Sequence, residues 1–240
     1  MRDAFPSKVI ACSVSAEKVN MVNLGDEFPN FSVRTTIGVI DFHKWIEDSW
    51  AILFSHPADF TPVCTTELGR VAKLVPEFNK RGVKLIALSC DNVDSHKGWI
   101  KDICSFSELD NEEFPYPIIS DEGRDLAVQL GMIDPKEKDE KGLPLTCRAV
   151  FIIGPDKKLK LSILYPATTG RNFDEILRVV DSLQLTANKQ VATPVDWKQG
   201  EDCMILPTVK DDDVPKLFPK GVKVQAVPSG RGYLRFTPQP

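Results

Sequence analysis

The stretch that decides the fold is His56-Pro57-Ala58-Asp59-Phe60-Thr61-Pro62-Val63-Cys64-Thr65-Thr66-Glu67-Leu68. The run before it, 50–55, is apolar and has the length of a strand, whereas apolar residues recur at helical spacing after it, through Val75. Cys64 is therefore expected where a strand leads, through a loop with two prolines, into the first turn of a helix. Unpaired N–H groups and the helix dipole favour an anion there, and they lower the pKa of a cysteine. Many cysteines at helix starts are inert core residues, so the assignment needs partners.

Segments of strand and helix character alternate on both sides of this stretch. A hairpin is expected over 31–42 around a glycine turn, followed by a short helical turn at 43–47. The strands 148–153 and 158–164 flank Gly154-Pro155-Asp156-Lys157, whose turn chemistry predicts antiparallel neighbours. The alternation predicts an α/β fold with helices on both faces of a sheet. The other expected segments are strands at 83–89 and 118–119, helices that start at Asp94 or Ser95, at Glu122 and at Asn172 or Asp174, and a solvated loop over 134–142.

The texture of the sequence divides the chain into three parts. Residues 1–21 form an extension whose apolar piece, 9–14, is too short for a convincing secretory signal. Residues 22–185 carry the alternating segments, and beyond about Thr186 prolines, turns and short strand-like pieces dominate. We therefore expect a main domain over 22–185 and a smaller unit over 186–240, which packs on the main domain or on another subunit.

Composition and charge exclude several classes of protein. The net charge of −4 and the pI near 5.5 provide no electrostatic surface for nucleic acid. No apolar run approaches the roughly 18 residues that span a bilayer, which predicts a soluble protein without a transmembrane segment. None of the six cysteines stands in a Cys-x-x-Cys pair, which argues against a zinc site and against a thioredoxin-type dithiol. Widely spaced free thiols fit a reducing compartment, so we expect a cytoplasmic protein.

The loop before Cys64 carries a recognisable pattern. Pro57 stiffens the loop, and Pro62 biases Thr61 toward an extended backbone that can place its hydroxyl beside a thiolate. The pattern Pro57-x-x-x-Thr61-x-x-Cys64 resembles the signature of the peroxiredoxins, and its surroundings resemble their 1-Cys, peroxiredoxin-6 type. The resemblance extends from about Leu24 to the C-terminal end. It implies a thioredoxin-like fold with a central mixed sheet flanked by helices, a small C-terminal domain and a homodimer.

The resemblance also implies an activity and roles for named residues. Cys64 would attack hydrogen peroxide or an organic or lipid hydroperoxide and become a sulfenic acid, as an antioxidant enzyme without a cofactor does. Thr61 would hold the peroxide. Arg148 would lower the thiolate pKa and stabilise the departing oxygen, although from its sequence context alone it reads as a surface residue. The supporting residues implied are His56 beside the sulfur, and Glu67 and Arg171 around the arginine.

Reduction of the sulfenic acid depends on a second thiol. Two-cysteine peroxiredoxins use a C-terminal cysteine in a Val-Cys-Pro context, whereas this chain has Asp202-Cys203-Met204. We therefore expect a 1-Cys cycle with an external reductant, either glutathione or another small thiol or thiol protein. Cys203 as a resolving cysteine is the minority alternative. The cysteines interpreted as structural are Cys90, Cys104 and Cys147.

Three other interpretations compete with the peroxidase. The same subfamily resemblance implies a calcium-independent phospholipase A2 set at Ser49, His43 and Asp156. Both glycines of a Gly-x-Ser-x-Gly elbow are absent, however, and Ser49 precedes a strand. A redox-sensing chaperone or adaptor could use the same cysteine without turnover. His96 with its neighbouring aspartates is an incomplete ligand set, so we interpret it as a helix-start cluster and expect no metal.

Overall fold

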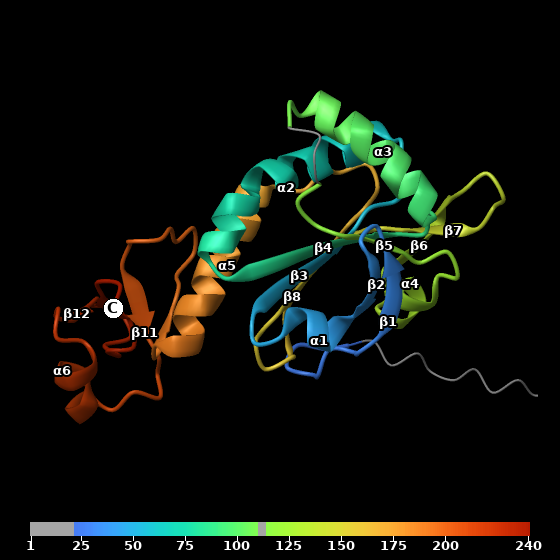
Figure 1. Ribbon diagram of the computed structural model, residues 1–240. Coiled ribbons are helices and arrows are strands. Elements are labelled where there is room, and N and C mark those ends of the chain that lie inside the picture. Colours follow the sequence, from blue (N-terminus) through green and yellow to red (C-terminus); the bar gives the residue numbers. More distant parts are fainter. Residues whose placement is uncertain (1–21, 110–113) are drawn as a thin grey trace, which may run out of the picture.

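A seven-stranded sheet with the order β2-β1-β5-β4-β3-β8-β9 forms the centre of the molecule (Figure 1). The computed structural model describes residues 22–109 and 114–240, so the expected N-terminal extension lies outside the described residues. The strands of this sheet are β1 (Ser32–Thr35), β2 (Gly38–Asp41), β3 (Trp50–Ser55), β4 (Val83–Ser89), β5 (Ile118–Ser120), β8 (Arg148–Ile153) and β9 (Leu159–Tyr165). The helices around it are α1 (Phe42–Ile46), α2 (Pro62–Lys80), α3 (Val93–Phe106), α4 (Asp125–Gln129) and α5 (Phe173–Asn188).

Parallel and antiparallel pairings are mixed in this sheet. β3 lies parallel to β4 and β4 lies parallel to β5, since α2 and α3 serve as the crossover connections. β8 pairs antiparallel with both β3 and β9, and β1 pairs antiparallel with β2. The expected hairpin, the strand before Cys64 and the antiparallel pair around residues 154–157 are therefore confirmed, as is the α/β class with a central mixed sheet.

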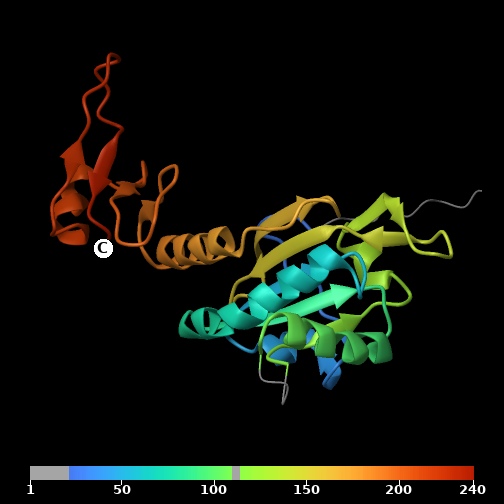
Figure 2. The same ribbon diagram turned by 90° about the horizontal axis from the view of Figure 1, so that it is seen from above.

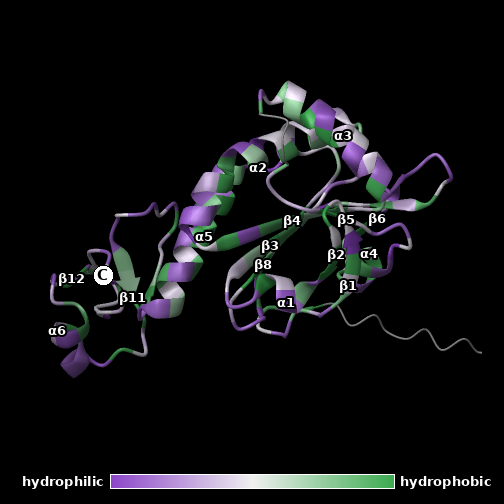
Figure 3. Cartoon of the chain, viewed as in Figure 1, coloured by the Kyte–Doolittle hydropathy of each residue, from purple (hydrophilic) through white to green (hydrophobic). Residues whose placement is uncertain are grey.

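The sheet separates two apolar cores, because successive side chains of a strand point to opposite faces. In β3, Ile52 and Phe54 pack with α2, α3 and α5 on one face, whereas Ala51 and Leu53 pack with α1 and α4 on the other. The central strands β3 and β8 are buried on both faces and are coloured as hydrophobic in Figure 3. Burial on both faces explains why these segments are continuous apolar runs rather than alternating ones.

Three local predictions are wrong. The charged run 134–142 is not a simple loop, because β6 (Ile133–Lys138) pairs antiparallel with β7 (Pro144–Thr146). Helix α3 is capped by Asn92, whose side chain accepts the Ser95 N–H, and not by Asp94 or Ser95. Helix α4 starts at Asp125 and not at Glu122. Each error concerns a short polar segment, where hydrophobic periodicity provides no signal.

A separate four-stranded sheet forms the C-terminal unit. Its strand order is β10 (Val191–Ala192), β11 (Cys203–Ile205), β13 (Arg235–Thr237) and β12 (Lys223–Val224). The unit has its own core around the fully buried Trp197, and α5 connects it to the main domain (Figures 1 and 2). The predicted boundary at residue 185 falls inside α5, so the division at that residue stays a prediction.

The acidic run 210–213 carries local structure. Asp211–Asp213 forms a 3-10 turn that leads into α6 (Val214–Leu217), and Asp211 pairs with Arg235.

None of the helices in residues 22–109 and 114–240 has the length and apolar character needed to cross a membrane.

Candidate active site

Cys64 lies in the first turn of α2, at the position that the sequence predicts. Thr61 precedes the helix with extended dihedral angles (φ −115°, ψ 147°), and Pro62 occupies the first turn, where its missing N–H costs no hydrogen bond. The Cys64 side chain is fully buried at the edge of the larger apolar core. The strand β3 and the loop 56–61 therefore deliver a cysteine to a helix N-terminus, where backbone N–H groups favour a thiolate.

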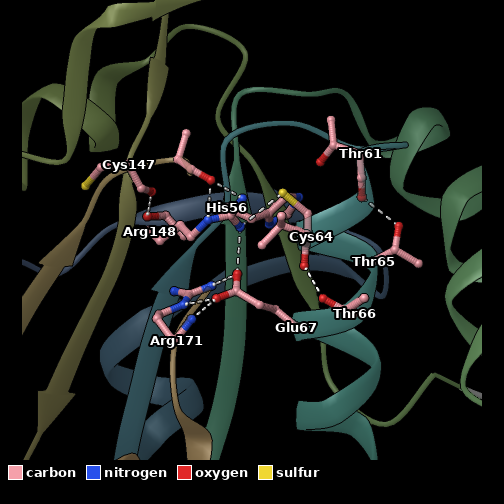
Figure 4. Close-up of polar contacts among 12 residues, drawn as sticks. His56, Thr61, Cys64, Thr65, Thr66, Glu67, Cys147, Arg148 and Arg171 are labelled. Atoms are coloured by element: carbon pink, nitrogen blue, oxygen red, sulfur yellow. Dashed lines mark hydrogen bonds and ion pairs between the residues drawn. The ribbon is translucent and has the colours of Figure 1, made fainter. Parts of the chain in front are cut away.

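Arg148, the first residue of β8, contacts the sulfur directly. Its Nη1 lies 3.3 Å from Cys64 Sγ and 2.7 Å from Glu67 Oε2, and the guanidinium is only 3% exposed (Figure 4). Nε and Nη2 both donate to the carbonyl oxygen of Ala167, at 2.9 and 2.6 Å. All three guanidinium nitrogens therefore make hydrogen bonds, and these bonds hold Nη1 toward the cysteine.

Glu67 and Arg171 complete a buried network behind Arg148. Arg171 donates from its backbone N (2.6 Å) and from Nε (3.0 Å) to Glu67 Oε1, and from Nη2 (2.8 Å) to Oε2. Burial opposes ionisation of Glu67, but the hydrogen bonds and charges of Arg171 and Arg148 outweigh it and lower the Glu67 pKa. Two guanidiniums thus share one carboxylate, which leaves one positive charge that a thiolate at Cys64 would balance.

Thr61 presents an unfilled acceptor to the site. Its hydroxyl donates to the Ala58 carbonyl oxygen at 2.8 Å, so the hydroxyl lone pairs remain available to accept a hydrogen bond from the O–H of a peroxide. Thr61 also lines two surface pockets of about 440 and 480 Å³ that flank the loop. The first is lined largely by aromatic and apolar side chains, including Phe60, Pro62, Trp99 and Phe106.

His56 is fully buried, but its ring bonds to a residue that the sequence analysis did not identify. Its Nε2 lies 2.9 Å from Asp59 Oδ1, and no hydrogen bond joins its ring to Cys64. Burial lowers the His56 pKa, and the hydrogen bond and charge of Asp59 only partly offset this. Asp59 also bonds to His96, 37 residues further along, which the sequence analysis assigned to a helix-start cluster. Pro57 stands between His56 and this aspartate in the loop.

The residues of the lipase hypothesis are not joined to one another. His43 donates from Nε2 to the Phe28 carbonyl oxygen at 2.7 Å. Asp156 pairs with Lys160 and caps its own turn, and Ser49 donates its backbone N–H to the Ile46 carbonyl oxygen. Among the described residues, no hydrogen bond links two of the three side chains.

The other cysteines of the described residues are buried to different degrees, and burial disfavours their thiolate forms. Burial raises the pKa of Cys90 to about 12 and that of Cys147 to about 11. Burial also raises the pKa of Cys104 and of Cys203. Cys203 lies in β11 of the C-terminal sheet, and Cys64 lies in the main domain near the opposite end of α2 from the C-terminal unit (Figure 1).

Comparison with known proteins matches this geometry to a family. A model of the AhpC/TSA family matches residues 24–162, and a model of the C-terminal domain of 1-Cys peroxiredoxin matches residues 182–221. Peroxiredoxin-6 of Bos taurus is 68% identical over 218 residues, which are 90% of this chain and 97% of that protein. The chain is a peroxiredoxin. Peroxiredoxin-6 of Homo sapiens is 66% identical over the same shares of both chains.

Solved structures of peroxiredoxins superpose on nearly the whole described chain. A cysteine-to-serine variant of the peroxiredoxin 6 of Arenicola marina is 64% identical, with a TM-score of 0.89 over 91% of this chain and 99% of that one. A yeast mitochondrial 1-Cys peroxiredoxin is 42% identical, with a TM-score of 0.80 over 91% and 100% of the two chains. This peroxiredoxin is therefore a thiol-dependent peroxidase of the 1-Cys type, and the expected family and thioredoxin-like fold are confirmed.

Proposed function

We propose that Cys64 is the peroxidatic cysteine of this peroxiredoxin and that Arg148 and Thr61 hold the peroxide against it. One observation carries the proposal: a single Nη1 of Arg148 lies 3.3 Å from Cys64 Sγ and 2.7 Å from Glu67 Oε2. The guanidinium stays protonated at any working pH, so it stabilises the thiolate before the reaction and the departing oxygen during it. Glu67 and Arg171 are supporting residues that hold this guanidinium in place.

The proposed oxidation is a two-electron displacement at oxygen. The Cys64 thiolate attacks one peroxide oxygen, the S–O bond forms as the O–O bond breaks, and the departing oxygen takes a proton to leave as water or an alcohol. The cysteine is oxidised to the sulfenic acid and the peroxide is reduced. The Thr61 hydroxyl donates its own proton to the Ala58 carbonyl oxygen, so it accepts a hydrogen bond from the peroxide O–H. This bond orients the peroxide for attack by the sulfur.

An external thiol is proposed to complete the cycle. The first thiol displaces water from the sulfenic acid to form a mixed disulfide, and a second thiol releases the Cys64 thiol and a disulfide of the reductant. Cys203 lies in the sheet of the C-terminal unit, fully buried, which supports a reductant from outside the chain. A yeast 1-Cys relative is described as resolved by glutathione and thioredoxin systems, and we propose glutathione for this chain.

Turnover of peroxide with glutathione tests the proposal. Cys64→Ser is expected to abolish turnover and the peroxide-dependent addition of glutathione, as measured by intact mass. Cys90→Ser serves as the matched control, because burial raises the Cys90 pKa to about 12 and its thiol is largely protonated. Persistent turnover in Cys64→Ser refutes the assignment. A Cys64–Cys203 disulfide in peroxide-treated protein would replace the external thiol with an internal one.

The aromatic pocket favours peroxides with an apolar tail as substrates. Phe60 and Phe106 are 58% and 63% exposed, and with Trp99 they line the 440 Å³ pocket beside Thr61. An alkyl or acyl chain bound there would bury exposed apolar surface. We propose lipid hydroperoxides as substrates beside hydrogen peroxide. Phe106→Ser is expected to raise the KM for an apolar hydroperoxide and leave that for hydrogen peroxide unchanged.

We further propose a homodimer formed along β9. Within the described residues, this strand ends the seven-stranded sheet and pairs with β8, beyond its first residue without a strand on its other side, and Leu164 is 55% exposed. An unpaired edge strand of this kind is a template for a second strand. Leu164→Lys is expected to shift the protein toward the monomer in sedimentation velocity. An unchanged mass would place the dimer interface elsewhere.

A cytoplasmic location stays a proposal, supported by free thiols that suit a reducing compartment. The alternative function of a redox-sensing chaperone or adaptor predicts one oxidation per chain and then arrest. Continued peroxide consumption with glutathione in excess separates the enzyme from the sensor.

A further inference from the structure

A buried polar cluster ties the catalytic loop to helix α3. Asp59, in the loop before Cys64, is 7% exposed, and the rings of His56 and His96 are fully buried on either side of it. His56 Nε2 lies 2.9 Å from Asp59 Oδ1, and His96 Nδ1 lies 2.8 Å from Asp59 Oδ2. The Ser95 hydroxyl also donates to Oδ2, at 2.7 Å. One carboxylate therefore receives three side-chain hydrogen bonds inside the protein.

The hydrogen-bond partners of His96 show which of its ring nitrogens carry a proton. Its Nε2 lies 3.1 Å from the carbonyl oxygen of Ile119, and a carbonyl only accepts, so Nε2 carries a proton. Burial opposes ionisation of Asp59, but the hydrogen bonds and charges of the two histidines outweigh it and hold its pKa well below its usual range. An ionised Asp59 also only accepts, so His96 Nδ1 carries a proton too. The hydrogen-bond pattern thus requires an imidazolium at His96.

The hydrogen-bond partner of His56 and the burial of its ring indicate a neutral imidazole. Its Nε2 must donate to the Asp59 carboxylate, and burial lowers the His56 pKa, so a neutral ring leaves a lone pair on Nδ1. Among the described residues, His56 Nδ1 is the one buried side-chain polar atom without a hydrogen-bond partner. A buried unsatisfied polar group is rare and destabilising, and such groups recur at catalytic sites.

The distances among Asp59, His56 and His96 are explained by hydrogen bonds, without a metal ion between them. The N–O separations of 2.8 and 2.9 Å are those of charge-assisted hydrogen bonds, and each is satisfied by a proton. A cation bound between the rings and the carboxylate would displace these protons and compete with the Ser95 hydroxyl for Oδ2. The geometry therefore assigns protons to this cluster.

The cluster lies within the framework of the catalytic site. The ring of His56 packs against Trp99 in a tilted arrangement with centroids 5.0 Å apart, and Trp99 Nε1 donates to Thr65, the residue after Cys64. The backbone oxygen of His56 accepts from Thr146, two residues before Arg148. Figure 4 shows His56 between the strand end that carries Arg148 and the helix start that carries Cys64. His56 is therefore linked to both sides of the site, through its backbone oxygen to the strand of Arg148 and through its ring and Trp99 to the helix of Cys64.

We propose that Asp59 and His96 are positioning residues for the peroxidase reaction. The His96 imidazolium fixes the Asp59 carboxylate, and this carboxylate holds His56 as the Nε2–H tautomer with Nδ1 as an open acceptor at the catalytic site. The inference rests on the proposed function of Cys64, because it assigns the open acceptor to that reaction. Asp91 is the other charged group of the cluster: its Oδ2 accepts the Asp59 backbone N–H at 2.9 Å.

Nitrogen NMR of the imidazoles tests the proton assignment directly. In the full-length reduced protein labelled with ¹⁵N-histidine, at pH 7, His96 is expected to show two protonated nitrogens and His56 one protonated and one bare nitrogen. The same pattern is expected in Cys64→Ser, which has no turnover. A protonated His56 Nδ1, or a bare nitrogen on His96, overturns the proposal even if no variant folds. A pattern that responds to added zinc with stoichiometric binding overturns it in favour of a metal.

Kinetics test the positioning role. His96→Gln removes the imidazolium, and we expect a roughly tenfold slower reaction with hydrogen peroxide together with a mixed His56 tautomer. His43→Gln is the matched control, because His43 lies outside the cluster and a glutamine amide can keep the bond of its Nε2 to the Phe28 carbonyl oxygen, and its rate is expected to stay within twofold of the wild-type rate. An unchanged rate in His96→Gln with an altered His56 tautomer overturns the role. If hydrogen peroxide did not oxidise Cys64 in the wild-type protein, the proposed function would be refuted, and the proton pattern of the two histidines would stand.

Discussion

Removal of the Arg148 guanidinium is the sharpest perturbation of this site. In Arg148→Gln the cation 3.3 Å from Cys64 Sγ is lost, and Glu67 keeps its hydrogen bonds to Arg171. Two unit charges at that separation interact by about 5 kcal/mol at an effective dielectric constant of about 20. Glu67, 2.7 Å from the same Nη1, offsets part of this attraction. We therefore expect a loss of about 3–4 kcal/mol of transition-state stabilisation, which corresponds to a rate lower by about 10²–10³-fold.

The assay is stopped-flow oxidation of the reduced protein by hydrogen peroxide under pseudo-first-order conditions. The second-order rate constant reports the attack step alone, because no reductant is present. Arg148→Lys is expected to fall between the wild type and Arg148→Gln, since it keeps a charge but loses the fork that bonds to Ala167. Alkylation of Cys64 by iodoacetamide at pH 7 is expected to slow in the same order.

A control and a refuting result complete this test. Arg70 lies on the same helix and pairs with Asp174, with both side chains more than half exposed, so Arg70→Gln should react at the wild-type rate. Thermal unfolding of each variant checks that the fold is retained. A folded Arg148→Gln that reacts within threefold of the wild type would show that the guanidinium does not act on the sulfur or on the leaving oxygen.

Three further outcomes follow from the site. Thr61→Val is expected to lower the rate constant for peroxide by about tenfold, whereas Thr61→Ser, which keeps the hydroxyl, stays near wild type; equal rates in both variants would remove Thr61 from peroxide binding. Glu67 has a lowered pKa in the folded protein, so its stabilising contribution is present above about pH 4.5 and is lost as the pH falls below that value. Glu67→Gln is expected to be less stable at pH 7. The midpoint of its unfolding in urea should depend less on pH between pH 3 and 6 than that of the wild type. Ser49→Ala is expected to leave peroxide turnover unchanged and, in a phospholipid hydrolysis assay, any hydrolysis unchanged, because Ser49 has no bond to His43 or Asp156; a selective loss of hydrolysis would restore the lipase set.

Much of the fold was predictable because the central strands are buried on both faces. A strand such as 148–153 must then be a continuous apolar run, and that pattern is visible without a structure. The hairpin of β6 and β7 was missed because its exposed charges carry neither the period of a strand nor that of a helix. The cap at Asn92 was missed because Asn92, Asp94 and Ser95 are all residue types that cap helices, so local chemistry does not select one of them.

The site divides in the same way. Thr61, Pro62 and Cys64 are neighbours in the chain, so their loop and helix start were predictable from local chemistry. Arg148 is 84 residues from Cys64, and by residue type alone it reads as a surface arginine; its place came from family resemblance. Asp59 was missed and His96 was assigned to a helix-start cluster, because each is ordinary in its own segment and only their contact makes a buried cluster.

The sequence by itself determined that a cysteine would stand at the start of a helix behind a proline-stiffened loop, since dihedral preferences and apolar periodicity act over a few residues. Tertiary structure alone decided that two arginines share one buried carboxylate beside that cysteine, and that a histidine pair encloses Asp59. These contacts form only when β8, α3 and the segment after β9 close around α2. Long-range electrostatics depends on distances that the order of residues does not encode locally, and the reactivity of Cys64 depends on those distances.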